Sequence, residues 1–378
     1  MKRHGILILV AYIVLCCFCI IGCVSAERKV RIFDVNSGGV MEIRNAASDY
    51  TREIAESSPC QSGSAFATLQ NRMGCDGVYD RSIIRVYDTN AFLRCTSFIS
   101  SPDGIYLSPR SFSVCSGKVI FWNSKFDAKN ERWKSPSELC IATLVDGGGA
   151  AEVQRFQMPT GSGETIAWDQ SFMWSSPTSI VANVECWNDK KCMKKIVVVD
   201  VSSGSCRFLP FDIRSMEILL SSFEGSLSRR FFSFIKPNGE VAVCDGQGNV
   251  CRVINIDQLR TFGLYETLSA ENLTICWDDD DVLWVFNPNG IYVGVDVETN
   301  SVIRNGRASL NREEELVGLI QKRYAVVKQR RGSEIICNIL GARYFIKDLE
   351  TGSCVTKMPN CISGYAYLGN GLMLLTDL

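Results

Sequence analysis

The amino-acid sequence predicts an all-β fold in which seven similar units form a closed ring. Three observations predict it. A phrase made of a β-type apolar run, an aspartate and a turn recurs seven times along the 378-residue chain. The stretches between the copies supply further short runs of β-branched and aromatic residues, which are typical of strands. The two ends of the chain supply complementary halves of one unit. Together these features predict a seven-bladed β-propeller of four-stranded antiparallel blades.

The repeated phrase sets the period of the fold, because its aspartates lie 45 to 58 residues apart. A four-stranded blade takes ~40 to 50 residues plus its loops, so one copy fits one blade. Short runs broken by Gly, Asn, Pro and Asp do not fit a helical solenoid. We expect each repeated aspartate to accept hydrogen bonds from the backbone of its own turn. The seven runs are Val30–Asp34, Ile84–Asp88, Ala142–Asp146, Ile196–Asp200, Val241–Asp245, Tyr292–Asp296 and Tyr344–Asp348.

The remaining strands of a blade are visible between two copies of the phrase. Those expected between Asp200 and Asp245 are Cys206–Leu209, Met216–Leu220 and Phe231–Ile235. At the C-terminus, two further strands are expected at Tyr365–Leu368 and Leu372–Thr376. These would complete the blade that the N-terminal strands begin, which removes open sheet edges from the ring. One propeller domain is therefore expected over residues 27–378.

The repeat resembles those of seven-bladed propellers of the WD, NHL and YVTN type. The resemblance covers nearly all of residues 28–378 and rests on the Asp phrase. It implies a propeller superfamily but no specific family. No functional residues of any family are therefore transferred to this chain.

Residues 1–26 have the layout of a secretory signal peptide. Lys2 and Arg3 form a positive start, an apolar run follows, and a small-residue site ends at Ala26. Two alternatives are an uncleaved membrane anchor and a lipobox around Cys23. A secreted, lumenal or cell-surface location is expected, with membrane attachment only through an uncleaved N-terminal anchor.

Cysteine usage agrees with that location. Of the 18 cysteines, four lie in the signal region, which leaves an even number in the mature chain. Behind a signal sequence these predict disulfides, although buried reduced thiols are the alternative. Two local pairs flank turns, Cys244 with Cys251 and Cys186 with Cys192. The sequence contains one N-glycosylation sequon, Asn-Leu-Thr, which begins at Asn272.

Several classes of function are excluded by composition. The single histidine, His4, lies in the signal region, so histidine-dependent nucleophiles and metal sites are absent from the mature chain. The 40 basic and 41 acidic residues nearly balance, which gives no reason to expect nucleic acid as a partner. Carboxylate chemistry remains, since glycosidases need only paired Asp or Glu.

Two charged clusters are candidate sites. Asp278, Asp279, Asp280 and Asp281 are a weak candidate for Ca²⁺, although consecutive strand residues point apart and a solvated turn is the alternative. No other cofactor is expected. A basic group suggests partner contact or an ordinary strand with charged ends, and its members are Lys322, Arg323, Lys328, Arg330 and Arg331.

The leading hypothesis is a binding module without catalytic activity that takes a protein or glycan partner. If the Asp turn joins the third and fourth strands, the opposite face carries the long connections Lys125–Pro136, Ile254–Tyr265 and Asn305–Glu315. The alternatives are an extracellular carboxylate-dependent glycosidase-like enzyme and a structural piece of an adhesion complex. No catalytic residue is assigned.

Overall fold

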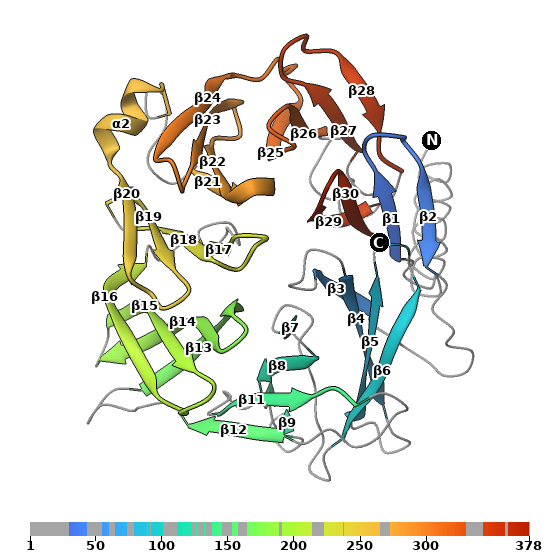
Figure 1. Cartoon of the computed structure of the whole chain (residues 1–378), viewed down its shortest axis with the longest axis vertical. Coiled ribbons are helices and arrows are strands. Elements are labelled where there is room, and N and C mark those ends of the chain that lie inside the picture. Colours follow the sequence, from blue (N-terminus) through green and yellow to red (C-terminus); the bar gives the residue numbers. More distant parts are fainter. Residues whose placement is uncertain are drawn as a thin grey trace, which may run out of the picture.

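The protein is a ring of seven four-stranded antiparallel sheets around a central axis (Figure 1). The fold expected from the repeat is therefore confirmed. The computed structural model describes residues 30–43, 55–59, 65–73, 79–88, 90, 92–100, 112–115, 117–122, 126–127, 132–133, 138–145, 153–157, 165–188, 191–213, 223–236, 238–264, 273–329, 343–359 and 362–377.

Six blades are built from strands that follow one another in the chain, the first being innermost. Blade 1 contains β3 (Ala55–Pro59), β4 (Ala65–Met73), β5 (Tyr79–Asp88) and β6 (Leu93–Ser100). Blade 2 contains β7 (Phe112–Cys115), β8 (Lys118–Trp122), β11 (Glu138–Thr143) and β12 (Val153–Gln157), with a separate hairpin of β9 (Phe126–Asp127) and β10 (Arg132–Trp133). Blade 3 contains β13 (Thr165–Ser176), β14 (Ser179–Asn188), β15 (Lys191–Asp200) and β16 (Cys206–Ile213).

The next three blades follow the same plan. Blade 4 contains β17 (Phe223–Gly225), β18 (Phe231–Ile235), β19 (Val241–Asp245) and β20 (Val250–Ile254). Blade 5 contains β21 (Thr274–Trp277), β22 (Val282–Phe286), β23 (Ile291–Asp296) and β24 (Ser301–Arg307). Blade 6 contains β25 (Glu314–Ile320), β26 (Tyr324–Gln329), β27 (Arg343–Asp348) and β28 (Cys354–Lys357). The strand expected at Met216–Leu220 lies outside the described residues.

The seventh blade closes the ring with strands from both ends of the chain. Its order is β2 (Val40–Ile43), β1 (Val30–Asp34), β30 (Leu372–Asp377) and β29 (Ile362–Gly369). β1 pairs antiparallel with β30, so that Val30 lies opposite Thr376. This confirms the closure expected from the sequence and gives both strands a hydrogen-bonding neighbour.

The repeated aspartate ends the third strand of most blades and organises the turn to the fourth strand. The carboxylates of Asp34 and Asp200 each accept the N–H of the residue two positions on, at 2.9 Å. The turn then needs positive φ four residues after the aspartate. Gly204 supplies it with φ +70°, a conformation that costs glycine little. In blade 2, β11 ends before Asp146, which lies outside the described residues.

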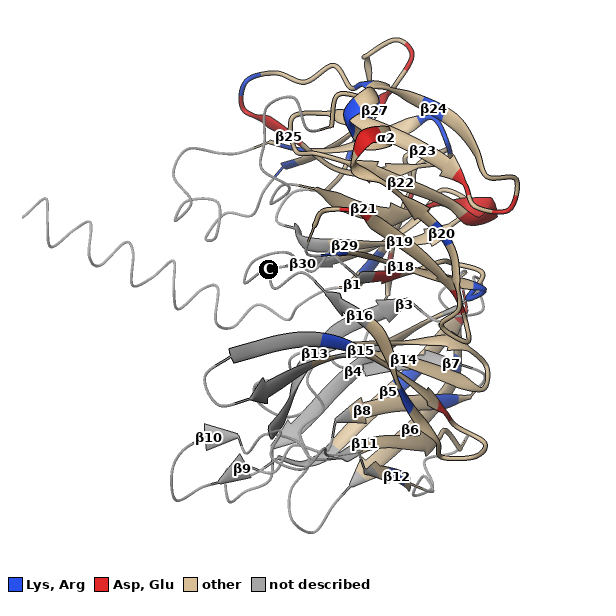
Figure 2. Cartoon of the chain, turned by 90° about the vertical axis from the view of Figure 1, so that its left-hand side faces the viewer, with Lys and Arg blue, Asp and Glu red and all other residues tan. Residues whose placement is uncertain are grey.

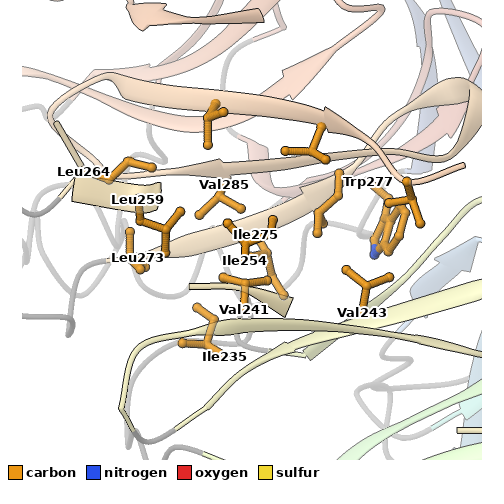
Figure 3. Packing of buried hydrophobic residues seen from close by; sticks show 14 of the residues in the cluster. Ile235, Val241, Val243, Ile254, Leu259, Leu264, Leu273, Ile275, Trp277 and Val285 are labelled. Atoms are coloured by element: carbon orange, nitrogen blue, oxygen red, sulfur yellow. The ribbon is translucent and has the colours of Figure 1, made fainter. Parts of the chain in front are cut away.

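Apolar side chains between neighbouring blades hold the ring together. Figure 3 shows the cluster between blades 4 and 5, where β19 of one blade faces β21 and β22 of the next. Burying one such side chain contributes about 1.5–3 kcal/mol, so each blade depends on its neighbours for stability. The labelled residues are Ile235, Val241, Val243, Ile254, Leu259, Leu264, Leu273, Ile275, Trp277 and Val285.

The antiparallel order divides the loops between two faces of the ring. The turns between first and second strands share one face with the Asp turns, and we call it the Asp-turn face. The turns between second and third strands and the links between blades lie at the other ends of the strands, on what we call the connection face. Figure 2 shows the ring from the side, with the acidic turn after β21 in red at one of its two faces.

The N-terminal prediction is not tested, because residues 1–26 lie outside the described residues. In the part of the chain that the structure describes, no helix has the length and apolar character needed to span a membrane.

Candidate interaction surfaces

The acidic run at the start of blade 5 is the most densely bonded part of the Asp-turn face. Asp278 is fully buried, with 0% of its surface exposed. Its Oδ1 accepts the Gln321 N–H at 2.7 Å and the Asp279 N–H at 2.9 Å. Its Oδ2 accepts the Lys322 N–H at 2.7 Å and the Trp284 Nε1–H at 3.1 Å. Burial raises the pKa of Asp278, while these four donors act in the opposite direction.

Asp279 and Asp281 connect blade 5 to two other blades. Asp279 accepts a hydrogen bond from the Tyr367 hydroxyl of blade 7 at 2.6 Å. Asp281 is buried and accepts from Arg230 of blade 4 through Nε at 3.0 Å and Nη2 at 2.5 Å. The Ser228 hydroxyl of blade 4 donates to the other oxygen of Asp281. The run therefore ties blades 4 and 7 to blade 5.

Asp280 is the exposed member of the run. It adopts φ 56°, in the left-handed region that Asp tolerates better than most residues. Its side chain is 77% exposed and forms an ion pair with Lys322 Nζ at 2.8 Å. The hydrogen bond and charge of Asp280 raise the pKa of Lys322. This pair joins blade 5 to blade 6 at the surface.

The four aspartates thus bond to three other blades: Asp278 and Asp280 to blade 6, Asp279 to blade 7 and Asp281 to blade 4. Within the described residues, no group of three or more His, Cys, Asp or Glu side chains is arranged to hold a metal ion. Asp278 and Asp281 are buried, so the run differs from the fully solvated turn that was the alternative, and the Ca²⁺ site stays a prediction.

The basic candidates are divided between the two faces. Lys322 and Arg323 lie in the β25–β26 turn on the Asp-turn face, where Arg323 Nε donates to Asp348 at 2.7 Å. Lys328 lies near the other end of β26 and contacts Glu315 at 3.5 Å. β26 thus has basic residues near both of its ends, which is the alternative arrangement that the sequence indicated for this basic group. Arg330 and Arg331 lie outside the described residues.

A second set of contacts between blades was missed by the sequence analysis. Arg207, Arg252 and Arg304 lie in the fourth strands of blades 3, 4 and 5. Each donates to a backbone oxygen on the Asp-turn face of the next blade. Arg252 Nη1 donates to Asp296 O at 3.4 Å, and Arg207 donates to Gln247 O. The signal was present, because each arginine follows the Asp of its own blade by seven or eight residues.

The innermost strands of blades 4, 5 and 7 carry three titratable side chains that interact electrostatically. Burial raises the pKa of Glu224 on β17 to about 7, and Arg229 partly offsets this. Charge interactions link Glu224 with Cys276 on β21 and Tyr365 on β29. The Tyr365 hydroxyl donates to Val317 O at 2.8 Å, which joins blades 7 and 6. Glu224 was not selected from the sequence, because only ring closure gives it these neighbours.

The cysteine candidates are positioned on paired strands. A bulge between Val243 and Cys244 places Cys244 opposite Val250, with Cys251 next in the chain. Cys244 is buried, Cys251 is exposed, and both are free thiols in the structure. The disulfide between them stays a prediction.

The other cysteine pair lies in the β14–β15 hairpin of blade 3. There Cys186 lies opposite Met193, and Cys192 lies opposite Trp187, one step out of register. That disulfide also stays a prediction. Asn272, the glycosylation candidate, lies outside the described residues.

The long connections lie at the expected end of the strands. The 254–265 connection contains helix α2 (Ile256–Thr261), which begins at a capping box formed by Asn255 and Gln258. The 305–315 connection runs from β24 to β25, and the Ala308 N–H donates to Gly290 O at 2.8 Å. Of the 125–136 connection, the structure describes only β9 and β10.

No protein-family model matches the chain, and no curated protein matches it. Solved structures resemble it at low identity. Raptor from Chaetomium thermophilum is 12% identical with a TM-score of 0.41, and the match covers 87% of this chain and 28% of that one. The WD40 β-propeller domain of Doa1 is 12% identical with a TM-score of 0.40, and the match covers 87% of this chain and 94% of that one.

Proposed function

We propose that this propeller is a protein-binding module that acts in the secretory pathway, at the cell surface or outside the cell. We further propose that the connection face carries its recognition surface. One observation carries this proposal. On the Asp-turn face of blades 4 to 6, Arg230, Lys322 and Arg323 form ion pairs with other parts of the ring. The connection face instead carries the long loops, which the rigid strands of the ring hold in place. Loops held by a rigid scaffold are the usual carriers of recognition.

The connection face offers exposed polar groups from adjacent blades. Helix α2 of the link after blade 4 presents Asp257 and Arg260, whose side chains are 89% and 65% exposed. The next link presents Arg312 and Glu313, both exposed. A partner lying across these links would contact side chains that no buried network requires.

The proposal is tested by affinity capture of the full-length protein after expression in a secreting cell, followed by mass spectrometry. Two variants change the connection face without changing net charge: Asp257→Lys with Arg260→Glu, and Arg312→Glu with Glu313→Lys. We expect each to reduce recovery of the captured partner while thermal unfolding stays within a few degrees of wild type, because these side chains are exposed.

The matched control exchanges one exposed ion pair on the other face, Asp280→Lys with Lys322→Glu. It keeps the pair but reverses both charges. We expect partner recovery to stay at the wild-type level in this control. Loss of capture in the control alone would move the recognition surface to the Asp-turn face and contradict the proposal. Recovery of the protein in the cytosolic fraction of the cells, with none in the medium, would contradict the proposed location.

A second candidate function is supported by one observation, the raised pKa of Glu224 on β17. A carboxyl group that keeps its proton near neutral pH is suited to general-acid catalysis, as in glycoside hydrolysis. A panel of glycan substrates at mildly acidic pH tests it. Hydrolysis that disappears in Glu224→Gln would favour this enzyme over the binding module.

A further inference from the structure

The strand ends of blades 5 and 6 on the connection face carry four exposed basic side chains, which we call the basic edge. Its members are Arg307 at the end of β24, Arg312 before β25, Arg343 at the start of β27 and Lys357 at the end of β28. All four are exposed. None forms an ion pair with another described residue.

The acidic side chains beside the basic edge are mostly occupied. Glu314 is largely buried and pairs with Lys347 Nζ at 2.5 Å. Glu315 contacts Lys328 at 3.5 Å. Among the described residues of these strand ends, Glu313 is the exposed carboxylate that remains. The basic edge is therefore a local positive excess in a chain whose total charge is almost zero.

We propose that the basic edge binds an acidic segment of a polypeptide partner. This inference rests on the proposed function, because it names the chemistry of the partner that the connection face recognises. Exposed arginines that form no ion pair with a described carboxylate can form bidentate hydrogen bonds to Asp or Glu of a partner. Pairing with such a segment gains charge complementarity without breaking an ion pair of the ring.

The spacing of the strand ends of blade 6, which carry Arg343 and Lys357, suits an extended peptide. Glu314 at the start of β25 lies opposite Gln329, which lies opposite Arg343. Neighbouring strands are about 4.8 Å apart, so the ends of the four strands of blade 6 span roughly 14 Å. An extended chain rises about 3.3 Å per residue, so about five residues cover this distance.

A polypeptide fits the basic edge better than a sulfated glycan. Glu313 lies next to Arg312 in the same turn and would repel a polymer that is negative at every unit. A polypeptide can place a neutral or basic residue opposite Glu313 and acidic residues opposite the arginines. The mixture of charges therefore favours a sequence-defined partner.

The test measures binding of a fluorescein-labelled peptide of alternating glutamate and serine to the full-length secreted protein. Two charge reversals are compared with wild type, Arg307→Glu with Arg312→Glu, and Arg343→Glu with Lys357→Glu. We expect each to raise the Kd at least about tenfold. Arg307→Lys with Arg312→Lys keeps the charges but loses the bidentate hydrogen bonds, so it should raise the Kd less than the charge reversals do. Affinity for the wild-type protein should fall as ionic strength rises.

The exchange Asp280→Lys with Lys322→Glu on the other face is the control and should leave the Kd unchanged. The inference is overturned if the peptide does not bind, if the reversals leave its Kd unchanged, or if a heparin fragment binds the basic edge more tightly. Its failure is distinguishable from that of the proposed function. A cellular partner still captured through the connection face by both reversal variants would refute the basic edge alone.

Discussion

Replacing each aspartate of the acidic run by asparagine should lower the free energy of unfolding by different amounts, because the four side chains form different contacts. Asparagine keeps the shape of the side chain but replaces one acceptor oxygen with an NH₂ donor. At position 278 both carboxylate oxygens accept two N–H donors each. Either orientation of the amide in Asp278→Asn therefore places its NH₂ against two donors. No rotation of the side chain relieves this conflict.

The size of the effect follows from those contacts. Hydrogen bonds to charged acceptors contribute about 1.5–3 kcal/mol each, so the loss of two in a buried site predicts a destabilisation of about 3–6 kcal/mol for Asp278→Asn. Asp280→Asn loses one exposed ion pair, for which we expect a change of about 0–1 kcal/mol. Asp281→Asn should fall between them, because its buried carboxylate loses its charge beside Arg230.

Urea unfolding of the four variants, followed by tryptophan fluorescence, measures these differences. Unchanged m-values would show that the same cooperative unit unfolds in each variant. Domains are stable by about 5–15 kcal/mol, so the Asp278→Asn effect lies well within the measurable range. Stability of Asp278→Asn within about 1 kcal/mol of Asp280→Asn would refute the assigned contacts.

Three further predictions concern the interior and the secretory location. Because the pKa of Glu224 rises from its ordinary value of 4.5 to about 7 on folding, the folded state holds the proton more tightly, and stability should fall by up to about 3 kcal/mol as pH rises from 4.5 to 7. Glu224→Gln should remove this part of the decline in urea unfolding, and an unchanged decline would contradict the assignment. In the secreted protein, non-reducing peptide mapping should recover Cys244 joined to Cys251, and alkylation of both without reductant would contradict the pairing. Peptide N-glycosidase should lower the mass of the wild type but not of Asn272→Gln, and equal shifts would rule out this acceptor.

Local chemistry accounts for what the sequence predicted about the fold. Each Asp turn is formed by a few consecutive residues. The spacing of these turns in the sequence therefore predicts the number of blades, even when the arrangement of the ring is not known. Closure was predictable because each chain end carried strands that lacked partners. The side-chain contacts of the acidic run were not predictable in this way. The bond between Asp279 and Tyr367 joins residues 88 positions apart, and only the ring brings them together.

The same reasoning explains why the basic group was only partly interpreted from the sequence. Proximity in the chain placed Lys322, Arg323 and Lys328 in one cluster, yet β26 separates them between two faces. Conversely, Arg307 at the end of β24 and Arg343 at the start of β27 are distant in the chain but lie on the same face of adjacent blades. A basic surface of a propeller is therefore better identified from the basic residues at strand ends than from runs of basic residues in the sequence.

The two faces of the ring differ in the energy that a partner needs to break their ion pairs. A partner approaching Arg230 or Arg323 must compete with Asp281 or Asp348, which are buried carboxylates held in place by the ring. Removing their cations would leave those charges desolvated and unpaired, which is costly. Arg307 and Arg312 form no ion pair with a described carboxylate, so a partner approaching them breaks no ion pair within the described residues. The ion pairs of the Asp-turn face therefore stabilise the ring. On the connection face Arg307 and Arg312 form no ion pair with a described residue, which is why the proposed recognition surface is assigned there.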